Sequence, residues 1–273
     1  MSTVIYPSPI FGPVHSRRLG LSLGINLLPA DGKVCSFDCI YCECGLNAAR
    51  RPHSAMPARC LVAARLEERL RQMAADGCLP DVLTFAGNGE PTCHPHFAEI
   101  IGDTIALRDR YCPEAKVSVL SNATYIHRSE VHDALMRVDN NILKLDTVSP
   151  PYINNVDRPV GSYDVRRVIE GMKAFHGHVI IQTMFMRGEC VATDAVTGGG
   201  PSARAYSYSV DNTGEEYVGP WLEAVREIGP GRVMVYTIDR ETPVAGLLKA
   251  TREQLDNICS RVQAMGISCQ ASY

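Results

Sequence analysis

Short apolar strands and amphipathic helices alternate along most of this chain, and this alternation restricts the fold more than any other feature. Between the apolar runs, residues such as Val165, Val168 and Met172 recur at helical spacing. The runs that predict strands lie at 22–28, 82–86, 117–121, 142–148, 179–186, 233–238 and 267–271. Regular strand–helix alternation predicts a parallel sheet with right-handed crossovers.

The number of units favours an α/β fold that closes into a partial TIM-like (β/α)6 barrel, with an open doubly wound sheet as the alternative. Residues 1–20 contain three prolines and are expected to form an irregular N-terminal extension, with the barrel domain spanning 21–273. Residues 188–214 are rich in Gly, Ser, Thr and Ala and exceed a routine connection, so we expect a flexible insertion, either a lid or substrate loop or merely disordered chain. Thr251 and Gln254 have capping-box spacing and predict the start of the last helix.

Three cysteines, Cys35, Cys39 and Cys42, follow the first predicted strand with the spacing C-x3-C-x2-C. Three thiolates on one short loop suit an iron–sulfur cluster that leaves one iron without a protein ligand and therefore open to a cofactor. A structural zinc site is the alternative, and it would require Cys44 or Cys60 as a fourth ligand.

Composition and charge argue against several other classes of protein. No apolar run approaches the length of about 18 residues that a membrane span needs. The net charge of -3 gives no electrostatic signal for binding a phosphate backbone. Residues 1–18 lack the apolar segment of a secretory signal, so we expect a cytoplasmic protein with reduced thiols. Most of the remaining cysteines are expected to be small buried hydrophobes, with a second cluster as the alternative for some of Cys44, Cys60, Cys78, Cys93 and Cys112.

Polar residues follow the second predicted strand, and in parallel barrels the chemistry gathers at this end of the strands. Gly87, Asn88, Gly89 and Glu90 form a turn in which two glycines allow the backbone to approach a ligand closely. The third glycine of a dinucleotide-binding fingerprint is replaced by Thr92, which argues against that interpretation.

Further polar candidates lie on the next three predicted strands. Ser121 and Asn122 suit hydrogen bonds to a carboxylate or a ribose, although both residue types also favour helix caps. Lys144 and Asp146 share one face of the fourth strand, where buried charges require either a ligand or each other. Gln182 lies on the fifth strand.

These motifs together resemble the radical S-adenosylmethionine (SAM) superfamily. The resemblance rests on the three-cysteine loop with Tyr41 before its last cysteine, and on Gly87–Glu90, which is similar to the family's Gly-Gly-Glu-Pro motif with Asn88 inserted. It implies the partial (β/α)6 barrel of the radical SAM core, a 4Fe-4S cluster, and SAM bound to the open iron. It also implies cluster ligands at Cys35, Cys39 and Cys42, and SAM contacts at Tyr41, Gly87, Asn88, Gly89, Glu90, Ser121, Asn122, Asp146 and Gln182.

Longer stretches, at 12–26 and 236–243, resemble the wyosine-synthetase-related group within that superfamily, which includes a tRNA-modifying enzyme. No cysteine precedes Cys35, so the ligands of that enzyme's second cluster are missing, and the acidic balance does not favour tRNA. The resemblance therefore implies a radical enzyme with an unidentified small-molecule or peptide substrate and a reductant such as flavodoxin or ferredoxin. The alternatives are a wyosine-type tRNA-modifying enzyme, a non-catalytic electron-transfer module and a zinc-stabilised nucleic-acid binder. Candidate contacts for an anionic substrate group are His15, Arg17, Arg18 and Arg240.

Overall fold

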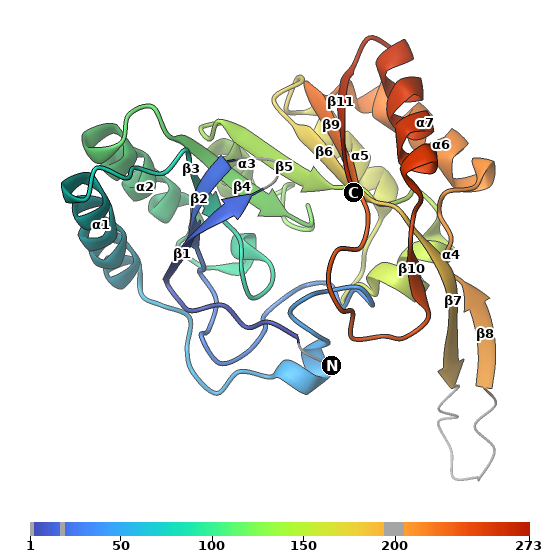
Figure 1. Cartoon of the computed structure of the whole chain (residues 1–273), viewed down its shortest axis with the longest axis horizontal. Coiled ribbons are helices and arrows are strands. Elements are labelled where there is room, and N and C mark those ends of the chain that lie inside the picture. Colours follow the sequence, from blue (N-terminus) through green and yellow to red (C-terminus); the bar gives the residue numbers. More distant parts are fainter. Residues whose placement is uncertain (1–2, 17–19, 194–204) are drawn as a thin grey trace.

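The computed structural model describes residues 3–16, 20–193 and 205–273, and its main body is a curved sheet of eight strands (Figure 1). The strands lie in the order β1-β2-β3-β4-β5-β6-β9-β11, and every neighbouring pair is parallel except β1 (Ile10–Ser16) and β2. The parallel strands are β2 (Gly20–Ile25), β3 (Val82–Phe85), β4 (Lys116–Ser121), β5 (Asn140–Lys144), β6 (Ile180–Met184), β9 (Arg232–Tyr236) and β11 (Ser268–Ser272).

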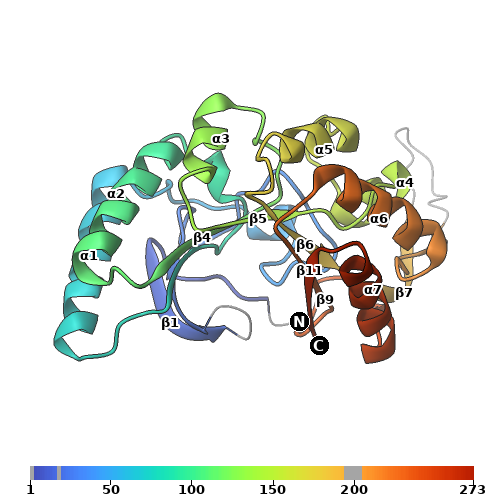
Figure 2. The same cartoon turned by 90° about the horizontal axis from the view of Figure 1, so that it is seen from above.

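The long helices line the outer face of this sheet, as Figure 2 shows from above. They are α1 (Arg59–Ala75), α2 (Phe97–Tyr111), α3 (Ser129–Leu135), α5 (Val165–Lys173), α6 (Glu215–Ile228) and α7 (Arg252–Ala264). Short turns of helix, η1 (Asn47–Arg50), η2 (Pro91–Cys93), α4 (Pro150–Tyr152) and η3 (Ile153–Asp157), lie in the connections. Helices on one face of a curled sheet are typical of a barrel and not of a doubly wound sheet, so the predicted partial TIM-like barrel is confirmed.

The apolar positions predicted from helical spacing are buried against the sheet. In α5, Val165, Val168 and Met172 are all buried, and each such side chain contributes on the order of 1.5–3 kcal/mol of transfer free energy. Thr251 and Gln254 form the predicted capping box at the start of α7. No helix among the described residues is both long and apolar enough to cross a membrane.

The prediction of an irregular segment over residues 1–20 was wrong for residues 10–16. Strand β1 (Ile10–Ser16) pairs antiparallel with β2 at the edge of the sheet, and a bulge lies between Phe11 and Val14. Gly12, with φ at +91°, and Pro13 occupy this bulge. Proline is tolerated in strands at edges and bulges, so its presence hid a real strand.

The described ends of the 188–214 segment also form strands. β7 (Met186–Thr193) pairs antiparallel with β8 (Ala205–Ser209), and β10 (Leu247–Lys249) completes a three-stranded sheet. Figure 1 shows this small sheet at the end of the molecule where α4 lies. Residues 194–204 fall outside the described part of the chain, so the flexibility of the insertion stays a prediction.

A second, smaller apolar core connects the small sheet to the barrel. Its buried members come from the cysteine loop, α4, η3, β6, β7 and the chain after β8 and β9: Ile40, Tyr152, Val156, Met184, Met186, Cys190, Val210 and Ile238. This cluster packs against Tyr41 and so supports one side of the cysteine loop.

Candidate functional site

The cysteine loop lies at the carboxyl end of the parallel strands, and its first part is bonded to the turn that follows β3. The Val34 amide donates to the Asn88 carbonyl oxygen over 3.0 Å, and the Glu90 amide donates to the Val34 carbonyl oxygen over 3.0 Å. This forms a parallel bridge between Val34 and Gly89, one residue before Cys35. The two sequence motifs are therefore joined directly through their backbones.

The middle of the loop is bonded to η3 and the residues after it. The Asp38 amide donates to the Asp157 carbonyl oxygen at 3.1 Å, and the Ile40 amide donates to the Val156 carbonyl oxygen at 2.9 Å. Phe37 forms an antiparallel bridge with Pro159. These bonds flank Cys39, so the loop is held from two sides.

The three thiols are only partly exposed and differ in their electrostatic surroundings. Burial raises the pKa of Cys35 to about 12 and raises the pKa of Cys39 well above its usual range. The pKa of Cys42 is lowered to about 6, chiefly by its interaction with the neighbouring Cys44 side chain, with a further contribution from the Lys33 ammonium group. Burial thus opposes the thiolate at all three positions and is outweighed only at Cys42, and a bound cation is the group that offsets such a cost.

This donor set fits an iron–sulfur cluster. The Cys42 amide donates to the Cys39 carbonyl oxygen at 3.1 Å, so a tight turn joins these two cysteines. Negative charge on Cys42 and Cys35 adds to the effect of burial in raising the pKa of Cys39. Among the described residues, no three Cys, His, Asp or Glu side chains are placed to share a single metal ion. A cluster takes each thiolate on a different iron and therefore does not require them to converge on one point.

The turn after β3 depends on its glycines. Gly87 and Gly89 have φ values of +135° and +130°. A Cβ atom on Gly89 would stand 1.9 Å from the Val34 carbonyl oxygen, so only glycine allows this bridge. Both glycines were predicted to allow a close approach of the backbone to a ligand, whereas the group that Gly89 approaches here is the Val34 carbonyl oxygen.

The inserted Asn88 is fully buried, and its side chain is bonded to protein backbone. Its Nδ2 donates to the carbonyl oxygens of Tyr6 (2.9 Å) and Pro29 (2.8 Å), and its Oδ1 accepts from the Tyr6 amide at 2.8 Å. The Asn88 side chain thereby fastens the N-terminal segment to the motif.

Glu90 brings together three of the predicted site residues. Its Oε1 accepts from the Ser121 hydroxyl at 2.8 Å and from the Thr92 hydroxyl and amide at 2.5 and 3.1 Å. Its Oε2 accepts from the Asn122 amide at 2.6 Å. Burial raises the pKa of Glu90, while these hydrogen bonds lower it. Only 2% of the Glu90 surface is exposed, so the role of the carboxylate is to hold Ser121 and Asn122 in place.

Asn122 extends this network to the cysteine loop. Its Nδ2 donates to the Ser36 hydroxyl over 2.8 Å and lies 3.6 Å from the Cys35 sulfur. The Asn122 side chain is therefore next to a candidate cluster ligand, which sequence reasoning did not foresee.

Tyr41, Lys144 and Asp146 meet in a buried ionic cluster inside the barrel. The Lys144 ammonium donates to the Tyr41 hydroxyl and to Asp157, each over 2.6 Å, and also to Asp146. The Tyr41 hydroxyl donates to Asp146, whose other oxygen accepts from the Met184 amide at 3.0 Å. The pairing of Lys144 with Asp146 is one of the two arrangements that the sequence analysis left open.

Asp157 is the member of this cluster that sequence reasoning missed. Burial raises its pKa to about 7, although the Lys144 ammonium opposes the shift. The residue lies in η3, 13 residues after Lys144, and no periodicity marks it. The one signal in the sequence was Lys144, because a buried ammonium group needs more than one acceptor and Asp146 supplies only part of that need.

The other candidates are less closely connected. Gln182 is in register with Lys144 on the neighbouring strand, so the two side chains share a face. Arg240 donates to the Tyr6 hydroxyl (2.9 Å) and to Glu43 of the loop (2.8 Å). His15 pairs with Leu21 at the amino end of β2, the opposite end from the cysteines. Arg17 and Arg18 lie outside the described residues.

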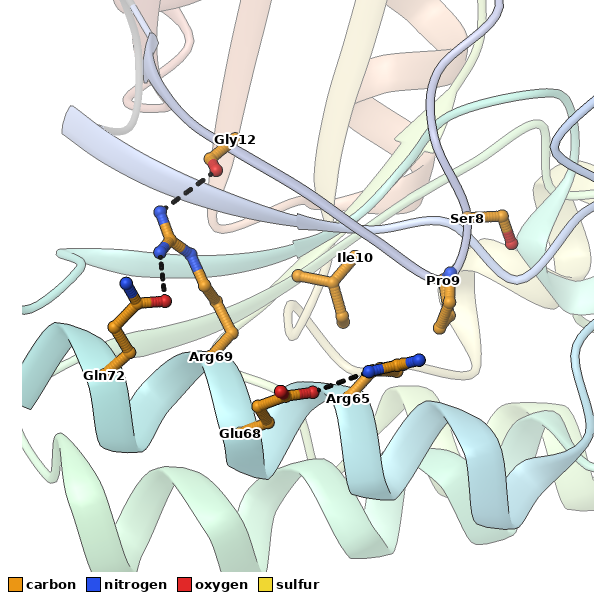
Figure 3. A pocket seen from close by; sticks show the side chains of 8 residues that line it. All are labelled: Ser8, Pro9, Ile10, Gly12, Arg65, Glu68, Arg69 and Gln72. Atoms are coloured by element: carbon orange, nitrogen blue, oxygen red, sulfur yellow. Dashed lines mark hydrogen bonds and ion pairs between the residues drawn. The ribbon is translucent and has the colours of Figure 1, made fainter.

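A separate cavity of about 300 Å³ lies between β1 and α1 (Figure 3). Its Arg65 is bonded to Glu68 and its Arg69 to Gln72 and the Gly12 carbonyl oxygen. These charges are engaged within the cavity wall and are not joined to the cysteine loop.

Residues 31–193, more than half of the chain, match the family model described as the radical SAM superfamily. A UPF0026 protein of Helicobacter pylori is 32% identical over 187 residues, which cover 67% of this chain and 58% of that protein. The UPF0026 protein MJ1312 of Methanocaldococcus jannaschii is 32% identical over 183 residues, covering 64% and 53%. The chain thus matches little more than half the length of these curated relatives.

Two solved structures show the same fold at low sequence identity. A radical SAM methyltransferase from Sphaerobacter thermophilus has a TM-score of 0.63 at 14% identity, covering 92% of this chain and 66% of that one. Streptococcus suis SuiB bound to S-adenosylmethionine has a TM-score of 0.59 at 16% identity, covering 91% and 50%. Membership of the narrower wyosine-synthetase-related group stays a hypothesis. By its matching family model and its curled half-barrel, the chain belongs to the radical SAM superfamily of enzymes, whose cofactors are a 4Fe-4S cluster and SAM.

Proposed function

We propose that Cys35, Cys39 and Cys42 hold the 4Fe-4S cluster and that the protein is a radical enzyme acting on a small molecule or a peptide. When bound, the cluster supplies one electron to SAM and so yields methionine and a 5'-deoxyadenosyl radical that abstracts hydrogen from the substrate. The observation that carries this proposal is the bridge between Val34 and Gly89, because it joins the three-thiol loop to the proposed SAM-binding turn.

The turn at Gly87–Glu90 would hold the amino group of SAM through its backbone. The Gly87 carbonyl oxygen already accepts from the Cys44 thiol at 3.2 Å, so it is oriented toward the cysteine loop. Glu90 has its carboxylate oxygens occupied by Ser121, Asn122 and Thr92, and it would position the turn from behind. The Asn88 side chain is bonded to the backbone of Tyr6 and Pro29, so it too would position the turn and would not contact SAM itself.

The interior face of β4, β5 and β6 would contact the rest of SAM. Ser121, Asn122 and Gln182 end or line these strands, and Asp146 follows β5 with Tyr41 bonded to it. The apolar cluster around Ile40 and Met184 would keep water from the reacting atoms, as radical chemistry requires.

The experiment is anaerobic reconstitution of the full chain, followed by dithionite and SAM. We expect 5'-deoxyadenosine from the wild type and none from Cys42→Ser, which should also lose cluster absorption. Cys60→Ser is the matched control, because Cys60 is exposed at the second residue of α1. An intact wild-type cluster that gives no 5'-deoxyadenosine would contradict the proposal.

Cys44 separates the proposed function from an electron-transfer module with four protein ligands. Its thiol is buried beside Cys42 and donates to Gly87. In the proposed function Cys44→Ser retains the cluster, since Cys44 is not a ligand. Loss of the cluster in Cys44→Ser, to the same extent as in Cys42→Ser, would favour the electron-transfer module.

The electron would come from a protein reductant of the flavodoxin or ferredoxin type. Radical SAM enzymes commonly need a reductant, and these small proteins are the candidate donors. Replacing dithionite by a reduced flavodoxin should support formation of 5'-deoxyadenosine, and a requirement for a ferredoxin instead would identify the other donor type.

A further inference from the structure

We propose that Lys33 and Asp38 act in opposite directions on the reduction potential of the cluster, Lys33 raising it and Asp38 lowering it. This inference rests on the proposed assignment of Cys42 as a cluster ligand. It concerns two side chains of the cysteine loop that are not themselves ligands in that assignment.

Lys33 is buried at the start of the cysteine loop. Only 1% of its side chain is exposed, and its Nζ donates to the Gly45 carbonyl oxygen at 2.8 Å. Its own amide donates to the Arg50 carbonyl oxygen at 2.7 Å. The lysine therefore connects the beginning of the loop to its end, with the ammonium group enclosed between them.

The bond from Lys33 to Gly45 also brings the ammonium group close to Cys42, because the Gly45 amide donates to the Cys42 carbonyl oxygen at 2.9 Å. The positive charge of Lys33 is accordingly one of the causes that lower the pKa of Cys42. Hydrogen bonds to cluster sulfurs and nearby charge are two of the properties that set the potential of an iron–sulfur site. Reduction adds a negative charge, and a cation in a buried site interacts with that charge far more strongly than it would in water. The position of Lys33 therefore favours the reduced form.

Asp38 is the counter-charge to Lys33. Its Oδ1 lies 3.7 Å from the Lys33 Nζ and accepts from the Asn47 amide at 2.7 Å. Its side chain is 25% exposed, so its field is more strongly screened by water than that of Lys33. The carboxylate consequently offsets part of the charge of the ammonium without cancelling it.

The second buried lysine near the loop has a different balance. Lys144 lies on the side of Cys39 and is paired with two carboxylates, Asp146 and Asp157. Because its charge is neutralised by these partners, Lys144 does not provide the same effect. Lys33 has one partly exposed carboxylate partner, whereas Lys144 has two buried ones. The positive charge of Lys33 is therefore less fully neutralised near the candidate ligand Cys42.

The test is the midpoint potential of the reconstituted cluster in the full chain, measured by an EPR-monitored redox titration without SAM. Lys33→Gln keeps a polar side chain but removes the charge, so we expect a lower potential than in the wild type. Asp38→Asn removes the counter-charge, so we expect a higher one. Lys116→Gln is the control, since Lys116 is 63% exposed at the amino end of β4 and should leave the potential unchanged.

The opposite signs distinguish this role from a purely structural one, which would change the cluster content of both variants but not move their potentials apart. The inference would be overturned if wild type, Lys33→Gln and Asp38→Asn had equal potentials with intact cluster absorption. The proposed function would still stand after that result. If Lys33→Gln fails to retain the cluster, the potential of Asp38→Asn tests the inference: a value above that of the wild type supports it, and an equal value overturns it. A wild type that binds no cluster overturns the proposed function and this inference with it.

Discussion

The Lys144 ammonium lies 2.6 Å from the Tyr41 hydroxyl, and this contact joins the cysteine loop to strand β5 across 103 residues of sequence. The hydroxyl in turn donates to Asp146. A short loop that carries three partly exposed thiols has little regular structure of its own. The contact therefore fixes the loop at the position between Cys39 and Cys42.

Removing this hydroxyl in Tyr41→Phe should destabilise the protein and weaken its hold on the cluster. Lys144 and Asp146 would each lose a buried partner, at a cost of about 1–3 kcal/mol. Tyr111→Phe is the matched control, because Tyr111 bonds Glu67 at 2.8 Å far from the loop. It should cost at most about 1 kcal/mol.

Urea unfolding and iron content, both measured without oxygen, check this prediction. The expected pattern is a loss of iron in Tyr41→Phe that Tyr111→Phe does not share. If the two variants retained equal iron, the anchoring role of the Tyr41 hydroxyl would be refuted.

The bridge between Val34 and Gly89 should not survive Gly89→Ala. The added Cβ would lie 1.9 Å from the Val34 carbonyl oxygen, and φ at +130° is strained for any L side chain. Strain of this type costs on the order of 1–3 kcal/mol even before the clash is counted. Cluster content and 5'-deoxyadenosine formation should both fall.

Gly229→Ala provides the comparison. Gly229 also has a positive φ, +61°, but no atom lies within 4 Å of the position of its Cβ. It ends α6, so the substitution should cost about 1 kcal/mol and leave the cluster in place. Similar cluster loss in both variants would show that strain alone is responsible and that the bridge to Val34 is not required.

Asn122→Ala should weaken the cluster through the residue's contact with the Cys35 sulfur. The loss of an outer-shell partner typically reduces metal affinity or activity by about 10–100-fold. Asn140→Ala is the control, because it removes a comparable bond, to the Ser118 hydroxyl at 2.9 Å, from the opposite end of the sheet. Iron retention during dialysis against a chelator measures the difference, and equal retention in the two variants would contradict the role.

Local patterns in the sequence were enough to predict the barrel and the two motifs. The helical spacing of Val165, Val168 and Met172 and the capping box at Thr251 depend on neighbours within a few residues, and all were confirmed. The three cysteines were recognised as one group from their spacing, which is a local property. The close approach of the backbone at Gly89 was likewise predicted from the residue type alone.

The residues that sequence reasoning missed act over long distances in the chain. Asp157 meets the cysteine loop through Asp38, and no periodicity reports such a contact. Lys33 was hidden for a different reason, because a lysine beside a turn normally points into solvent. Strand β1 was missed because Pro13 reads locally as a breaker, whereas an edge strand with a bulge accommodates it.

His94 should make the stability of the protein depend on pH. Its Nε2 lies 2.9 Å from the Pro57 carbonyl oxygen, and its Nδ1 accepts from the His96 amide at 3.1 Å. A neutral ring satisfies both bonds, with the proton on Nε2, whereas a second proton on Nδ1 would break the bond to His96. Burial, the largest cause, lowers the pKa of His94 in agreement with this geometry.

The sign of the dependence follows from this lowered pKa. In the unfolded chain the ring titrates near pH 6.5, so below that pH the unfolded state binds a proton that the folded state does not. The free energy of unfolding should therefore fall as the pH drops below about 6.5, and should level off below the pKa of the folded state. In His94→Gln this contribution is absent, so the stability difference between wild type and variant should shrink from pH 8 to pH 5.5. Urea unfolding across this range measures it, and parallel curves for the two proteins would show that His94 does not titrate with folding.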